Sequence, residues 1–197
     1  MSQLIESIRL KDGQFNNLNY HEQRMDCSLK EVYNIEGSSD LNHFFRTIEY
    51  PRKGLYKCRL LYDNRSKIVE FVPYTIKRVK SLKLIVANDI LYNHKYSNRV
   101  SINELFEKRD NCDDILIIKN GGVTDSSYAN IVFNSGEKWY TPQTYLLKGT
   151  MRESLIRSGE IQEVQIKSND IMRFKKFKLI NSMVGFEGPE LSVSNIF

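Results

Sequence analysis

Short strand-like runs, joined by short turns, are the feature that most constrains how this chain can fold. Leu4, Ile8 and Leu10 lie on one parity of the first run, which indicates a strand with one apolar face. The runs 55–62 and 68–74 flank a DNRSK turn and predict a hairpin. Strands this close together favour an α+β fold with a mixed or barrel-like sheet over a regularly alternating parallel sheet.

Helix-like segments are few. Residues 18–35 carry apolar side chains at helical intervals, and the segment 149–159 is bounded by glycines, so both are predicted helices. A further helix is predicted near Ser101, which stands three residues before Glu104 in the spacing of a capping box. We therefore expect Ser101 to be an N-cap.

The pattern of predicted elements changes near residue 83. Beyond it, DDILIIKNGG predicts a buried strand closed by a glycine turn, and ANIVFN and KWYTP predict an antiparallel pair. We expect a small α/β domain over residues 1–74, a linker over 75–82 and a larger domain over 83–197.

Composition excludes several classes of protein. The longest uninterrupted apolar runs, such as 84–87, are four residues long, far short of the roughly 18 that a transmembrane helix needs. Glu6 and Arg9 interrupt the segment where a signal peptide has its apolar core, so we expect a cytoplasmic protein without a membrane partner. The three cysteines are widely spaced and form no CxxC pair, which disfavours a disulfide framework and a zinc site.

The charge alone does not select a partner. With 29 Lys and Arg against 24 Asp and Glu, the formal net charge is +5, which suits nucleic acid, an anionic membrane or a small anionic substrate. The densest basic cluster, RFKKFK at 173–178, is better explained by a helix end that runs into a strand than by a platform for nucleic acid. His21, His43 and His94 lack metal-ligand spacing, so we expect surface or packing roles for them and no metal site.

Three dispersed side chains and one helix end suit the chemistry of pyridoxal phosphate (PLP). No GxGxxG, GxxxxGK[ST], HExxH or GxSxG motif competes with them. An amine such as that of Lys95 can form a Schiff base with the aldehyde, and a carboxylate such as Asp125 can keep the pyridine nitrogen protonated. The phosphate needs an arginine, such as Arg24, and backbone N–H groups, such as those at the start of the glycine-bounded helix.

Six motifs in this order resemble those of the class IV aminotransferases. They are HxxR at 21–24, HKYSNR at 94–99, GGVTDSSYANIVF at 121–133, WYTP at 139–142, LLKGTMR at 146–152 and NSMVGF at 181–186. The resemblance covers nearly the whole chain. It implies PLP fold type IV, with a small N-terminal α/β domain, here N-terminally shortened, and a larger pseudo-barrel domain. Within the family it is nearest to the 4-amino-4-deoxychorismate lyases.

The resemblance also implies roles for single residues. Lys95 would bind the coenzyme covalently and move the substrate proton as a general base and acid. Asp125 stands where the family usually has glutamate, so a side chain one methylene shorter would pair with the ring nitrogen. Arg24 matches the phosphate arginine, whose fork can meet two phosphate oxygens at once.

Two further segments are implied to bind the phosphate. The helix start at Thr150 and Met151 would add backbone N–H donors and the positive end of a helix dipole, and Met151 can help only through its main chain. Ser182 and Met183 match a second phosphate-contacting turn.

Substrate contacts are expected from basic residues on strands. Ser7 and Arg9 share a face of the first strand, and the resemblance directs this face toward the cofactor. Lys57 and Arg59 share a parity on a second strand, and Arg99 lies just beyond the catalytic lysine. A small anionic, amino-acid-like substrate with two carboxylates would use two such subsites.

The activity implied by the resemblance is the conversion of 4-amino-4-deoxychorismate to 4-aminobenzoate and pyruvate, a step of folate synthesis. A homodimer is expected, with aminodeoxychorismate synthase as a functional partner and no nucleic acid. One alternative is an aminotransferase for branched-chain or D-amino acids. Another is a non-catalytic binding protein on the same fold.

Overall fold

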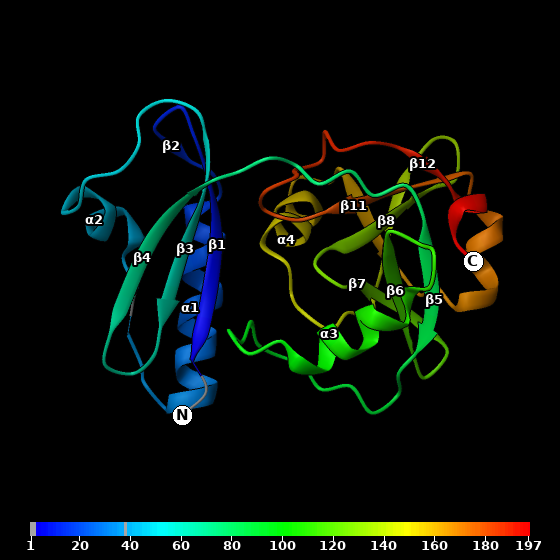
Figure 1. Cartoon of the computed structure of the whole chain (residues 1–197), viewed down its shortest axis with the longest axis horizontal. Coiled ribbons are helices and arrows are strands. Elements are labelled where there is room, and N and C mark those ends of the chain that lie inside the picture. Colours follow the sequence, from blue (N-terminus) through cyan, green and yellow to red (C-terminus); the bar gives the residue numbers. More distant parts are fainter. Residues whose placement is uncertain (1–2, 38) are drawn as a thin grey trace. The chain divides into compact units, whose positions relative to one another are not determined.

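The chain folds as two compact units, which are described separately (Figure 1). The computed structural model describes residues 3–37 and 39–197. The first unit comprises residues 1–76 and 94–98, and the second comprises residues 77–93 and 99–197. Both units combine helices with β-sheet, so the predicted α+β class is confirmed.

The first unit is a four-stranded sheet with one long helix. The sheet has the order β2-β1-β3-β4, and each neighbouring pair is antiparallel. The element bounds are β1 Leu4–Lys11, β2 Gln14–Phe15, α1 Leu18–Tyr33, α2 Leu41–Arg46, β3 Leu55–Tyr62 and β4 Lys67–Pro73. The predicted first strand and the hairpin of β3 and β4 are confirmed. The helix predicted over 18–35 ends at Tyr33, because Asn34 takes the left-handed conformation with φ 55°.

Alternation along β1 separates the two faces of this sheet. Leu4, Ile8 and Leu10 are fully buried, as is Leu60 of β3. Leu4, Ile8 and Leu60 pack with Met25 of α1 in one core. Burying a large apolar side chain stabilises the fold by about 1.5–3 kcal/mol, and a slip of one residue would turn this whole set outward. The helix-covered face therefore fixes the register of the strands.

A short segment from the middle of the chain, residues 94–98, completes the first unit. The backbone N–H of Ile5 donates to the carbonyl of Lys95 at 2.9 Å. Leu4 forms an antiparallel bridge with Tyr96. The segment thus attaches to β1 through its main chain.

This attachment differs from the domain boundaries expected from the sequence. The division into 1–74, 75–82 and 83–197 remains a prediction of domain organisation. It assigns residues 94–98 to the larger domain, whereas the contacts of the structure group them with the first unit. The reason is physical, since main-chain hydrogen bonds to β1 leave no trace in the pattern of side chains.

The second unit is built on a mixed sheet of eight strands. Its order is β10-β9-β8-β7-β6-β5, and β11 pairs with both β8 and β12. The strand bounds are β5 Leu82–Val86, β6 Asp114–Lys119, β7 Gly122–Ser126, β8 Asn130–Asn134, β9 Trp139–Pro142, β10 Ile161–Val164, β11 Lys176–Ile180 and β12 Leu191–Ser192. The helices are α3 Val100–Phe106 and α4 Thr150–Arg157, with 3-10 turns at Glu107–Arg109, Ser168–Arg173 and Val193–Asn195. The predicted antiparallel pair is β8 and β9, and the predicted glycine-bounded helix is α4.

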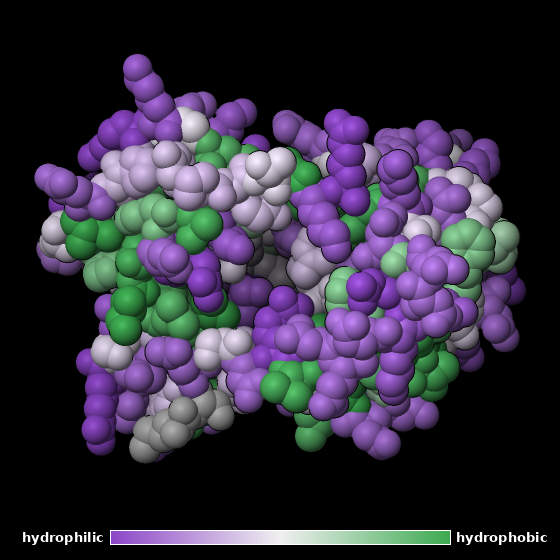
Figure 2. Space-filling model, viewed as in Figure 1, coloured by the Kyte–Doolittle hydropathy of each residue, from purple (hydrophilic) through white to green (hydrophobic). Residues whose placement is uncertain are grey.

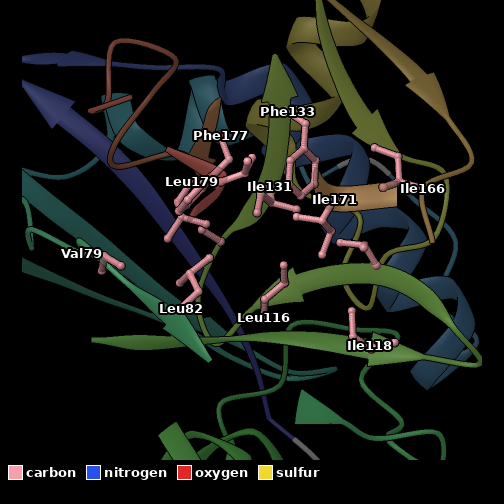
Figure 3. Close-up of a cluster of buried hydrophobic side chains, with 13 residues drawn as sticks. Val79, Leu82, Leu116, Ile118, Ile131, Phe133, Ile166, Ile171, Phe177 and Leu179 are labelled. Carbon is pink, nitrogen blue, oxygen red and sulfur yellow. The ribbon is translucent and has the colours of Figure 1, made fainter. Parts of the chain in front are cut away.

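A cluster of buried apolar side chains holds these strands together (Figure 3). Leu116 and Ile118 come from β6, Ile131 and Phe133 from β8, and Phe177 from β11. Because alternate residues of β8 are locked in this core, the start of β8 is held at a fixed place in the sheet.

The start of α3 differs from the prediction. The helix begins at Val100, and its N-cap is Arg99 rather than Ser101. The N–H of Asn103 donates to the carbonyl of Arg99 at 2.8 Å, so the first helical turn is already closed before Ser101 can cap it. The expected N-cap role of Ser101 is therefore wrong.

The basic RFKKFK cluster has the structural origin that the sequence favours. A 3-10 turn ends at Arg173, and β11 begins at Lys176. Phe177 is fully buried, and the ring of Phe174 packs against Phe133 with 5.1 Å between centroids. Both aromatic rings are used by the core.

Among the described residues, no helix combines the length and apolar character of a membrane span. The cysteines Cys27, Cys58 and Cys112 are free thiols. Burial raises the pKa of Cys58 to about 12. This thiol therefore stays protonated at neutral pH and acts as a small apolar core residue.

Candidate active site

Lys95 lies in the first unit, on the segment that runs beside β1. Its carbonyl accepts the N–H of Ile5. The preceding residue, His94, contacts two side chains of α1, with Nδ1 3.4 Å from Ser28 Oγ and Nε2 3.4 Å from the carboxylate of Glu31. The lysine is thus held between β1 and α1, and His94 has the packing role expected of it.

Beside this segment, β1 and α1 bury a carboxylate that the sequence motifs miss. The side chains of Glu6 and His21 are 0% exposed, and His21 Nδ1 lies 2.6 Å from Glu6 Oε2. Arg24 Nε donates to Glu6 Oε1 at 2.9 Å, and Nη2 donates to Glu6 Oε2. A sequence signal for Glu6 does exist. It shares the parity of Leu4 and Ile8, so a charged residue stands on the apolar face of the strand.

The charges of this network are set by burial and by Arg24. Burial by itself would raise the pKa of Glu6, but the nearby Arg24 charge and the His21 hydrogen bond outweigh it and lower the pKa to about 2. Burial lowers the pKa of His21, against the opposing effect of Glu6. At neutral pH the network therefore contains one carboxylate, one guanidinium and a neutral imidazole.

Arg24, the expected phosphate ligand, is bound in two places by Glu6. A guanidinium carries five N–H donors in a rigid planar fork, and the two bonds to Glu6 engage one edge of it. This bidentate contact fixes the plane of the guanidinium, and therefore the directions in which its other donors point.

Asp125 lies in the second unit on β7 and is 6% exposed. Its Oδ1 accepts a hydrogen bond from Asn130 Nδ2 at 2.8 Å, and its Oδ2 accepts the backbone N–H groups of Leu146 at 3.1 Å and Leu147 at 2.9 Å. Burial raises the pKa of Asp125 to about 6, although these hydrogen bonds oppose the rise.

Asn130, at the start of β8, connects Asp125 to the start of α4. Its Nδ2 also donates to the carbonyl of Leu147 at 3.0 Å. A Cβ at Gly149 would lie 1.8 Å from Asn130 Oδ1, so only glycine allows this approach. Asn130 is a second residue that the sequence motifs did not single out, although it is a polar residue within an otherwise apolar buried strand.

The start of α4 is where the sequence places phosphate contacts. Thr150 and Met151 are the first two residues of the helix, where backbone N–H groups have no acceptor within the helix and the dipole is positive. The next residue, Arg152, is buried and donates to the carbonyl of Pro142 at 2.8 Å, and it also pairs with Glu163. Arg152 thereby anchors the first turn of α4 to β9 and β10.

The turn after β11 contains the other two expected phosphate contacts. Asn181 Oδ1 accepts the backbone N–H groups of Met183 and Val184, each at 2.9 Å. The N–H of Met183 is therefore engaged within the turn. Ser182 stands between Asn181 and Met183, at the part-buried side of the same turn.

Four expected substrate residues share one face of the first unit's sheet. Ser7 pairs in register with Arg59, and Arg9 pairs with Lys57, so all four side chains leave the sheet on the side opposite α1. Arg59 donates to Glu70 Oε2 at 3.0 Å, which neutralises part of its charge. Arg9 Nε is buried without a hydrogen-bond partner among the described residues.

The surface around these strands mixes apolar and basic side chains. In the space-filling view, hydrophobic side chains gather over β3 and β4 among hydrophilic ones (Figure 2). The row in register with Leu61 contains Ile5 and Ile68, and Ile68 is exposed. The face therefore has an apolar end and a basic end along the direction of the strands.

Arg99, the fifth expected substrate residue, belongs to the second unit. It is the N-cap of α3, and its Nη2 donates to the carbonyl of Ser127 in the loop between β7 and β8. Its side chain thus holds the loop that follows Asp125.

Comparison with known proteins identifies similar sequences and a similar structure. An uncharacterized protein of Haemophilus influenzae is 40% identical over 94% of this chain and 100% of its own length. A Schizosaccharomyces pombe protein, named as a candidate aminodeoxychorismate lyase, is 28% identical over 82% of this chain and 76% of its length. The crystal structure of a candidate 4-amino-4-deoxychorismate lyase from Haemophilus somnus is 32% identical, with a TM-score of 0.88 over 94% of this chain and 98% of that one.

Residues 3–187 match the profile of amino-transferase class IV. The match covers most of the chain, and the fold of the Haemophilus somnus protein confirms the fold expected from the motifs. The enzymes of this family depend on PLP. The chain therefore belongs to the class IV amino-transferase family.

Proposed function

We propose that this protein is a PLP-dependent lyase that converts 4-amino-4-deoxychorismate to 4-aminobenzoate and pyruvate. The observation that carries the proposal is the basic pair of Arg9 and Lys57 on the sheet face opposite α1, with Arg9 Nε buried and lacking an acceptor within the described residues. A buried guanidinium N–H without an acceptor is costly, and a substrate carboxylate would satisfy it. The lyase names of two similar proteins support the choice of reaction.

The residues of this chain fit PLP as a cofactor. Asp125 is a buried carboxylate whose Oδ1 accepts one hydrogen bond from Asn130, which leaves acceptor capacity for the N–H of a pyridinium ring. Arg24 and the start of α4 at Thr150 and Met151 would hold the phosphate, together with the turn at Ser182. Lys95 would supply the amine that binds the aldehyde.

When bound, PLP supplies an electron sink for the charge left at a substrate carbon after proton removal. Once the substrate's amino group replaces it on the aldehyde, the released amine of Lys95 would remove the proton from the substrate carbon that bears this amino group. The C–O bond between the substrate's ring and its enolpyruvyl group would then break, and the substrate's ring would become aromatic. The released enol takes up a proton and becomes pyruvate, so the reaction needs no oxidant. Asp125 would keep the nitrogen of the coenzyme's ring protonated.

Substrate binding would use the basic pair. Arg9 would bind one carboxylate through its guanidinium fork, and Lys57 would attract the other as a point charge. Arg59 contributes less attraction, because Glu70 already pairs with it. Arg99 would act by holding the loop after Asp125.

The direct test is product formation. Purified protein is incubated with chorismate, glutamine and an aminodeoxychorismate synthase, and 4-aminobenzoate is quantified against a reaction without the protein. We expect product with the wild type and the rate of the protein-free reaction with Lys95→Ala. No product above that rate with the wild type would overturn the lyase proposal.

The same preparation separates the lyase from an aminotransferase. A transaminase converts the bound coenzyme to its pyridoxamine form when a simple amino acid is added, and a dedicated lyase does so poorly. A spectrum recorded after adding D- or branched-chain amino acids therefore distinguishes the two. The expected homodimer is tested on the same sample by its mass in solution.

A further inference from the structure

The network of Glu6, His21 and Arg24 has no role in the chemistry proposed above, apart from the phosphate contact of Arg24. Burying a carboxylate costs several kcal/mol of desolvation, and apolar side chains of similar size often fill such a position with equal or greater stability. A fully buried Glu6 on the apolar face of β1 therefore calls for a reason beyond packing.

The position of Glu6 on β1 supplies that reason. Ile5 and Glu6 are adjacent in sequence and point to opposite faces of the strand. The backbone N–H of Ile5 holds the carbonyl of Lys95, whereas the side chain of Glu6 holds the guanidinium of Arg24. One strand therefore sets the positions of the amine-bearing segment and of the phosphate arginine within the same unit.

His21 completes the arrangement from α1. Its Nδ1 lies 2.6 Å from Glu6 Oε2, the oxygen that also accepts from Arg24 Nη2. His21 and Arg24 are three residues apart on α1 and thus on the same face of the helix. The carboxylate of Glu6 is therefore held by hydrogen bonds to both.

We propose that Glu6 and His21 are positioning residues, which orient the guanidinium of Arg24 to receive the phosphate of the coenzyme. The inference rests on the proposed use of PLP. Glu6 acts through Arg24, because its carboxylate is fully buried and both of its oxygens bond to side chains of α1.

An opposing effect must be weighed. Glu6 is an anion and competes with phosphate for the charge of Arg24, so removing its charge could strengthen phosphate binding. Orientation and competition predict opposite changes in the affinity for phosphate, and this difference makes the inference testable.

The experiment compares two ligands, PLP and pyridoxal, which differ only in the phosphate group. The dissociation constant of each is measured by absorbance titration of the apoprotein, and the ratio of the two constants reports phosphate recognition alone. Glu6→Gln should weaken PLP binding about tenfold and leave pyridoxal binding unchanged, because a hydrogen bond between charged groups is worth about a factor of ten. Glu36→Gln, which breaks an exposed ion pair with Lys30 in the same unit, is the matched control and should change neither constant.

Two further variants keep the test decisive. Glu6→Asp retains the charge but withdraws the carboxylate by one methylene, so it should also lower PLP affinity if orientation matters. In an Arg24→Ala background, Glu6→Gln should have no additional effect on the ratio, since Glu6 acts through Arg24. Circular dichroism identifies any variant that does not fold.

The outcomes separate this inference from the proposed function. If the wild type binds neither PLP nor pyridoxal, the proposed cofactor is wrong. If the wild type binds PLP and Glu6→Gln leaves the ratio unchanged, Glu6 has no positioning role. A stronger preference for PLP in Glu6→Gln would also overturn the inference, because it would identify Glu6 as a competitor of the phosphate.

Discussion

Each unit buries one carboxylate among the candidate residues, and the two are stabilised in opposite ways. Glu6 in the first unit is paired with the charged Arg24. Asp125 in the second unit is hydrogen-bonded directly to neutral donors, namely two backbone N–H groups and the amide of Asn130. Burial by itself would raise the pKa of both carboxyls. With all effects included, the pKa of Glu6 is lowered to about 2, whereas that of Asp125 is raised to about 6.

The charge of the partner, rather than the depth of burial, decides the ionisation of these groups. The guanidinium of Arg24 favours the ionised form of Glu6 more than burial disfavours it, whereas neutral donors only partly offset the burial of Asp125. Glu6 is therefore a permanent ion that orients a neighbour. Asp125 remains responsive, since a cationic ring nitrogen beside it would draw it fully into the ionised form.

The largest effect is expected from removing the permanent ion. Glu6→Ala removes the buried carboxylate that pairs with Arg24 and His21, and breaking a buried ion pair in this way costs about 3–5 kcal/mol of the free energy of unfolding. Urea denaturation followed by circular dichroism measures the loss. Glu36→Ala, which removes an exposed carboxylate of the same unit, should stay within about 0.5 kcal/mol of the wild type. A loss below about 1 kcal/mol for Glu6→Ala would mean that the pair is not what stabilises this face of β1.

The next effect concerns the responsive carboxylate. Asp125→Asn keeps the size of the side chain but cannot carry the negative charge that holds the ring nitrogen protonated. The rate of 4-aminobenzoate formation at saturating substrate should fall about a hundredfold or more, in the range seen when a preorganised electrostatic contact is lost. Asp89→Asn, an exposed position of the same unit, should retain the wild-type rate. Equal rates for Asp125→Asn and the wild type would exclude Asp125 as the partner of the ring nitrogen.

Much of the fold follows from local patterns in the sequence. The alternation of Leu4, Ile8 and Leu10 predicts β1, and the turn after Tyr62 predicts the hairpin of β3 and β4, because parity and turn residues act over a few positions. The return of residues 94–98 to β1 could not be predicted in this way. Its contacts with β1 are main-chain hydrogen bonds between segments about ninety residues apart, and such bonds do not depend on side-chain type.

The residues of the candidate site also fall into two groups, those that sequence motifs predict and those that only the folded structure identifies. Lys95, Arg24 and Asp125 were accessible through motifs, since their chemistry requires particular side chains. Glu6 was missed although its parity places it on the apolar face of β1. Its partners His21 and Arg24 lie on α1 and meet it only when the strand and the helix pack. Asn130 was missed for a related reason. One of its hydrogen-bond partners is the backbone carbonyl of Leu147, and a backbone group gives no signal in the sequence.

A smaller effect tests the rigidity of the neutral shell around Asp125. In Gly149→Ala the new Cβ would lie 1.8 Å from Asn130 Oδ1. Asn130 cannot swing aside without breaking its hydrogen bonds to Asp125 and to Leu147. We expect a loss of about 1–3 kcal/mol in the free energy of unfolding, typical of overpacking.

The double variant identifies the cause of this loss. If the clash with Asn130 is responsible, Gly149→Ala should cost less in an Asn130→Ala background than in the wild type. Thermal or urea unfolding of the four proteins in this cycle provides the comparison. Additive losses would place the strain elsewhere and separate Gly149 from the shell of Asp125.

The smallest expected effect is a change in how the free energy of unfolding depends on pH, and it compares the two carboxylates directly. Asp125 has a pKa of about 6 in the folded protein against an ordinary value of 3.8, so the folded state binds the proton more tightly and the contribution of Asp125 to stability falls as pH rises from about 4 to about 6. Glu6 has a pKa of about 2 against an ordinary value of 4.5, so its contribution is complete above about pH 4.5 and is lost as pH falls toward 2.

The free energy of unfolding is measured from about pH 3 to about pH 7 for the wild type, Asp125→Asn and Glu6→Gln. The wild type minus Asp125→Asn should decrease between about pH 4 and 6, and the wild type minus Glu6→Gln should increase between about pH 3 and 5. The first difference reports Asp125, whereas the second reports Glu6 together with His21, because Glu6 raises the pKa of that imidazole. Slopes of the same sign in these two ranges would contradict the assignment of opposite partners.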